Sequence, residues 1–60
     1  MKYRAILMND DGSENQLLFS ANNLDYMREQ AQRELAKKPP GKWVKIEEMK
    51  WAFLEDVDRP

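Results

Sequence analysis

The stretch from Leu24 to Gly41 constrains the fold of this chain more than any other. Its first part carries apolar residues at intervals of three and four, namely Leu24, Met27, Ala31 and Leu35. This spacing places them on one stripe of a helix whose other faces are charged or polar. Pro39, Pro40 and Gly41 end the pattern, because proline cannot continue a helix. The sequence therefore predicts one amphipathic helix over residues 24–38, capped at its start by Asn22 or Asn23.

Two strands are predicted before this helix, over residues 2–9 and 16–21. The turn signal Asp10-Asp11-Gly12-Ser13 separates them, so the two strands are expected to form a β-hairpin. The first strand has two partly apolar faces, one with Tyr3, Ala5 and Leu7 and the other with Arg4, Ile6 and Met8. The second strand has one apolar face, formed by Leu17, Phe19 and Ala21.

The last third of the chain allows two interpretations. Residues 43–46 have strand character, and a hairpin with a turn at Met49-Lys50 would pair Ile46 with Phe53. Residues 46–57 also show helical spacing, and the turn lacks the glycine, asparagine or aspartate that a tight hairpin favours. We prefer the hairpin, which predicts an α+β domain of ββαββ order, with an antiparallel sheet and one helix packed on one face. The alternatives are ββαβ and ββαα.

The whole chain, residues 1–60, is expected to form one domain, with residues 56–60 as a flexible tail. Phe19, Phe53 and Trp51 are expected to form the core against the helical stripe. The sheet face away from the helix would then be open and apolar, formed by Ile6, Met8, Leu18, Trp43 and Leu54. A contiguous apolar patch of this kind is typical of an interface, so a homodimer through the open face is one expectation.

The composition argues against catalysis. The chain of 60 residues has no histidine and no cysteine, and ten basic residues balance eleven acidic ones. Histidine is the commonest general base and metal ligand at neutral pH, so we expect no enzyme activity, no cofactor and no metal site. The near-even charge is unlike that of proteins that bind duplex DNA mainly by charge. The sequence contains no run of about 18 apolar residues, so it predicts no membrane span. The lack of disulfides favours a cytoplasmic location.

One group of residues is a candidate partner-binding surface. Trp43 lies close in sequence to four lysines, and the group consists of Lys37, Lys38, Lys42, Trp43 and Lys45. A tryptophan beside lysines is typical of a protein-binding hot spot or of a platform on which nucleic-acid bases stack. The alternative is structural, with Trp43 covering the Pro39-Pro40 corner.

The order of elements also carries a resemblance. It comprises a strand from Tyr3, an acidic turn, Leu17-Leu18-Phe19-Ser20-Ala21, a helix, Trp43-Val44-Lys45-Ile46-Glu47 and Trp51-Ala52-Phe53-Leu54. This order resembles small phage-encoded inhibitor proteins of the anti-CRISPR type, which have one helix and an antiparallel sheet. The resemblance implies an inhibitor of a host protein or defence complex, acting in the host cytoplasm, and it assigns no functional residues.

Three functions follow as hypotheses. The first is a small non-enzymatic module that binds a protein partner. The second is a nucleic-acid-binding protein that uses the lysine and tryptophan group, and the third is a self-assembling structural subunit.

Overall fold

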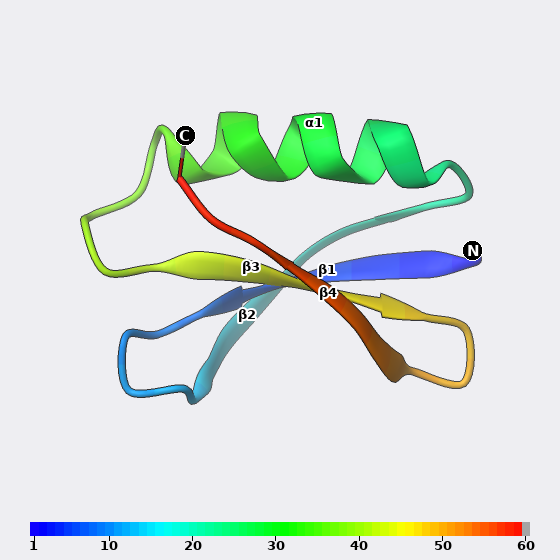
Figure 1. Ribbon diagram of the computed structural model, residues 1–60, viewed down its shortest axis with the longest axis horizontal. Coiled ribbons are helices and arrows are strands. Elements are labelled where there is room, and N and C mark those ends of the chain that lie inside the picture. Colours follow the sequence, from blue (N-terminus) through cyan, green and yellow to red (C-terminus); the bar gives the residue numbers. More distant parts are fainter. Residues whose placement is uncertain (60) are drawn as a thin grey trace.

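The computed structural model describes residues 1–59, and in this part of the chain it shows one four-stranded antiparallel sheet and one helix (Figure 1). The elements are β1 (Tyr3–Met8), β2 (Glu14–Ala21), α1 (Leu24–Leu35), β3 (Trp43–Glu48) and β4 (Ala52–Val57). The strand order is β2-β1-β3-β4, so β1 and β3 are central and β2 and β4 are edge strands. Figure 1 shows α1 along one side of the sheet. The predicted α+β fold of ββαββ order is confirmed, including the C-terminal hairpin.

The core lies between α1 and the sheet. The helix contributes Met27, Ala31 and Leu35, all fully buried, as the spacing predicted. The sheet contributes Ala5, Leu7, Val44, Ile46 and Val57. Each large side chain buried here contributes about 1.5–3 kcal/mol, so this single layer of contacts supplies most of the stability of the domain. The sheet face away from α1 is called the open face below.

A β-bulge in β2 changes the faces that simple alternation predicted. Ala5 pairs with Phe19, but the next residue, Ile6, pairs with Leu17, so Leu18 is an extra residue on β2. Residues that lie directly opposite each other share a face, and an extra residue reverses the alternation beyond it. Phe19 and Leu18 therefore pack against the core, whereas Leu17 lies on the open face beside Ile6. The prediction that Leu17 and Phe19 share a face is wrong for this reason.

The C-terminal hairpin is shifted by one residue from the predicted pairing. The turn has three residues, Met49 to Trp51, and Phe53 therefore pairs with Glu47 instead of Ile46. Because strand side chains alternate with period two, this shift places Phe53 on the open face. Phe53 is 60% exposed and Trp51 is 41% exposed, so the prediction that both belong to the core is wrong.

Strand β4 continues into the segment that was expected to be a flexible tail. Val57 is buried in the core, and the backbone carbonyl of Asp58 accepts a hydrogen bond of 2.8 Å from the Gln32 side chain on α1. The Arg59 guanidinium donates to the backbone carbonyls of Lys38 and Pro39. These contacts hold the chain against α1 and the segment that follows it, as far as Arg59, and Pro60 lies outside the described residues.

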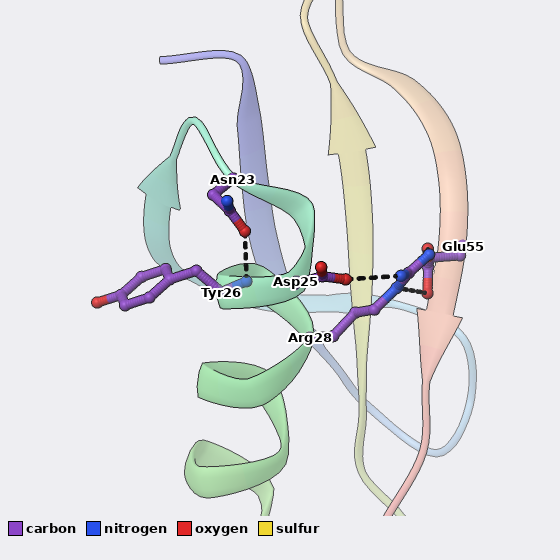
Figure 2. A network of polar contacts seen from close by, with 5 residues as sticks. All are labelled: Asn23, Asp25, Tyr26, Arg28 and Glu55. Atoms are coloured by element: carbon purple, nitrogen blue, oxygen red, sulfur yellow. Dashed lines mark hydrogen bonds and ion pairs between the residues drawn. The ribbon is translucent and has the colours of Figure 1, made fainter.

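Asn23, not Asn22, caps the helix. The Asn23 side-chain oxygen accepts a hydrogen bond of 2.9 Å from the backbone N–H of Tyr26, as Figure 2 shows. The Asn22 side chain instead accepts from the backbone N–H of Lys2. One turn into the helix, Arg28 bonds Glu55 on β4 at 2.8 Å, which joins this end of α1 to an edge of the sheet (Figure 2).

The two asparagines give a direct test of this capping. We expect Asn23→Ala to lower the free energy of unfolding by about 1 kcal/mol, because a helix N–H loses its partner. Asn22→Ala is the matched control and should cost less, since it removes one exposed hydrogen bond outside the helix. Urea denaturation followed by circular dichroism measures both. A larger loss for Asn22→Ala would contradict the assignment of the cap.

Candidate partner-binding surface

A ladder of alternating charges runs across the middle of the open face. Arg4 on β1 bonds Glu47 on β3 at 2.6 Å. Lys45 lies 3.4 Å from the second oxygen of Glu47 and bonds Glu14 on β2 at 2.8 Å. We call Arg4, Glu47, Lys45 and Glu14 the charge ladder. It links three neighbouring strands and pairs each of its charges with one of opposite sign.

The electrostatics of the ladder hold Lys45 and Glu14 in their charged forms. The hydrogen bond and the positive charge of Lys45 lower the pKa of Glu14 from its ordinary value. The same hydrogen bond, together with the charge of Glu47, raises the pKa of Lys45. Lys45 is therefore engaged by two carboxylates on its own sheet.

The open face is not the contiguous apolar patch that the sequence predicted. Ile6 is only 4% exposed and Met8 only 6%. Large neighbours flank both, since Lys45 is the β3 partner of Ile6 and Trp43 is that of Met8. A lysine covers apolar surface with its long stem while its charged end stays in water. The centre of the open face is thus covered by the chain itself.

The structure distributes the predicted lysine and tryptophan group over three places. Lys37 and Lys38 follow the end of α1, where Lys37 pairs with Glu34 at 3.2 Å. Trp43 is half-buried beside Met8 on the open face, and Lys45 follows it in the charge ladder.

Lys42 lies at the third of these places. Its ammonium donates to the Asn9 side chain in the β1–β2 turn at 3.0 Å. Three of the four lysines therefore already have side-chain partners within the domain.

The exposed apolar side chains gather at a different place, the β3–β4 hairpin. Within residues 49–54, four large apolar side chains are exposed: Met49 (58%), Trp51 (41%), Phe53 (60%) and Leu54 (36%). We call these four residues the hairpin cluster. Exposed apolar groups that cluster in this way are typical of interaction surfaces, whereas single ones are ordinary.

Arg4 joins the hairpin cluster to the charge ladder. Its guanidinium lies 4.3 Å from the centre of the Trp51 ring, while its Nε bonds Glu47. Phe53 is the cross-strand partner of the same Glu47. The cation holds the Trp51 ring in place without burying it, and a fixed, exposed aromatic side chain loses little conformational entropy on binding.

The turn that carries Trp51 is strained. Lys50 and Trp51 have φ angles of 76° and 59°, in the left-handed region that favours glycine. This conformation costs a non-glycine residue roughly 1–2 kcal/mol. Backbone strain of this kind concentrates at functional sites, where it fixes side chains in place.

The sequence predicts Trp43 as the exposed tryptophan, but in the structure Trp43 is half-buried and Trp51 is exposed. The error follows from the one-residue shift of the hairpin, which moves Trp51 and Phe53 out of the predicted core. Two features of the sequence indicate this exposed hairpin. The turn lacks the glycine or asparagine of a tight two-residue turn, and three large apolar residues, Met49, Trp51 and Phe53, lie close together.

Two other features, a metal-binding cluster and a membrane-spanning helix, are absent from the part of the chain that the structure describes. Within residues 1–59, no three acidic side chains gather closely enough to hold a metal ion. The helix there is too short and too polar to cross a membrane. No protein-family model, curated protein or solved structure matches the chain.

The strain in the turn gives a prediction. Lys50→Gly should raise the free energy of unfolding by about 1 kcal/mol, because glycine adopts a positive φ without steric cost. Lys37→Gly is the control, since Lys37 is also exposed but has no positive φ, and it should lower stability. Thermal and urea unfolding measure both variants. A destabilised Lys50→Gly protein would contradict the strained turn.

Proposed function

We propose that this domain is a non-enzymatic module that binds a protein partner through the hairpin cluster. The observation that carries the proposal is the strained turn that holds Trp51 exposed against Arg4. Tryptophan and arginine are the residue types that most often dominate binding energy at protein interfaces. Met49 and Phe53 are exposed in the same hairpin and supply further apolar contact area.

The partner that this surface fits is a protein with an apolar patch. Trp51, Phe53 and Leu54 would bury apolar area on contact, which is the main source of affinity in protein association. An inhibitor needs no more than such a surface, because occupying a target is enough to block it. The resemblance to small phage-encoded inhibitors is in keeping with this proposal, and the lack of cysteine suits a cytoplasmic setting.

The pairing of the lysines favours a protein over a nucleic acid as the partner. Lys45 and Lys37 are bound to carboxylates, and Lys42 is bound to Asn9. A phosphate backbone would have to displace these partners. Nucleic-acid binding driven by charge needs lysines that face outward together, and these lie in separate parts of the domain.

Photo-crosslinking tests the proposal at single residues. A benzoylphenylalanine at position 53 replaces one exposed aromatic side chain in the hairpin cluster. The matched control is the same group at position 26, where Tyr26 is 51% exposed on α1. Both variants are irradiated in a bacterial lysate, with and without nuclease, and the adducts are identified by mass spectrometry.

We expect a protein adduct from position 53 that survives nuclease and is reduced at least tenfold by Trp51→Ala. Position 26 should give no adduct with the same protein. The proposal fails if position 26 captures that protein equally well, or if adducts at position 53 disappear with nuclease.

A further inference from the structure

The edge strand β2 carries fewer charges than the other edge strand, β4. Strand β2 is eight residues long and pairs with β1 on one side only. From Asn15 to Ala21 it carries no charged residue. Natural proteins usually protect an exposed edge with charges, because its free backbone groups can pair with another strand.

The opposite edge, β4, is protected by comparison. It contains Glu55 and Asp56 and no basic residue, so two copies of β4 would repel each other. Arg28 from α1 also reaches over to bind Glu55 (Figure 2). The contrast between the two edges singles out β2 as the pairing edge.

We propose that β2 pairs antiparallel with β2 of a second copy of this chain. The two-fold axis would lie between Leu18 and Phe19, which gives an eight-stranded sheet with both helices on the same face. This inference goes beyond the proposed function and does not rest on it.

The faces of β2 support this register despite the two irregularities in its pairing with β1. Leu17 and Ser20 both lie on the open face, because they pair with Ile6 and Arg4. Antiparallel pairing about this axis places Leu17 of one copy opposite Ser20 of the other, so both stay on one face as a sheet requires. The same register places Gln16 opposite Ala21, and both of these belong to the helix-covered face.

The charges also suit a second copy. Glu14 is the one charged residue of β2. In this register it lies beside the C-terminal end of the second copy's β2, far from Glu14 of that copy. Glu14 itself stays paired with Lys45 in the charge ladder at 2.8 Å. The register therefore brings no like charges face to face across the paired strands.

The side chain that gains most from this contact is Leu17. It is 60% exposed and forms one wall of a hollow of about 300 Å³ on the open face, together with Arg4 and Ile6. A second copy would cover its outer side. The hairpin clusters would remain free at the two outer ends of the sheet, so the dimer would present two identical binding surfaces.

Sedimentation equilibrium tests the proposal with two matched variants. Leu17→Lys and Phe53→Lys each place a lysine at a site 60% exposed on the open face, one on β2 and one on β4. The wild type should show a concentration-dependent dimer. Leu17→Lys should raise its dissociation constant roughly tenfold or more, because the substitution occurs twice at the pairing edge. Phe53→Lys should leave it unchanged.

Hydrogen exchange of the wild type provides a test that needs no variant. Raising the protein concentration should slow amide exchange within residues 14–21 and leave residues 52–57 unaffected. The proposal is overturned if the wild type stays monomeric up to about 1 mM, a limit that excludes all but very weak pairing. It is equally overturned if Phe53→Lys weakens the dimer as much as Leu17→Lys, or if protection appears in β4.

Discussion

The arrangement of side chains on the open face depends on two contacts that the Arg4 guanidinium makes. Arg4 lies on the central strand β1, and its guanidinium bonds Glu47 on β3 and lies against the Trp51 ring in the β3–β4 turn. The ion pair is partly buried, because Glu47 is only 7% exposed, and it gives this carboxylate a partner of opposite charge. The cation–π contact with the exposed Trp51 ring contributes up to about 1 kcal/mol. The contribution of this contact to stability is small compared with that of the helix–sheet core, but the contact fixes the position of the Trp51 ring. The contact therefore determines the shape of a surface more than the stability of the fold.

The two faces of the sheet have separate roles as a result. The face under α1 is filled by aliphatic side chains, and its packing holds the domain together. The open face is covered at its centre by the charge ladder and by Trp43, which leaves exposed apolar groups only toward its rim. Trp51 and Phe53 lie toward one edge strand, and Leu17 lies on the other. The core thus packs against one face of the sheet, and exposed apolar side chains for contact remain near its two edge strands, β2 and β4.

The sequence was sufficient to predict the elements, and insufficient to predict their register. The helix followed from its stripe and its proline stop, and the first hairpin followed from the Asp-Gly turn. What the sequence did not show was one extra residue in each of four places: Asn15 and Leu18 in β2, Leu54 in β4 and the third residue of the Met49–Trp51 turn. An inserted residue has no composition signal of its own, yet it reverses the face of every side chain beyond it.

That reversal explains the errors about the candidate surface. Trp51 and Phe53 were assigned to the core because an unshifted hairpin would place Phe53 opposite Ile46. Trp43 was assigned to the surface, and it is half-buried beside Met8. The sequence therefore placed an exposed tryptophan on the face away from α1, but Trp51 is more exposed than the predicted Trp43.

The most direct measurement of the central claim is the order of the Trp51 side chain, read from ¹⁵N relaxation of its indole N–H. Arg4→Met keeps an apolar stem over the sheet and removes the charge that contacts Trp51 and Glu47. We predict that the Trp51 indole is as ordered as the Trp43 indole in the wild type, and that only Trp51 loses order in the variant. If Trp51 is equally ordered in both proteins, Arg4 does not hold the hairpin cluster in place and the account is wrong.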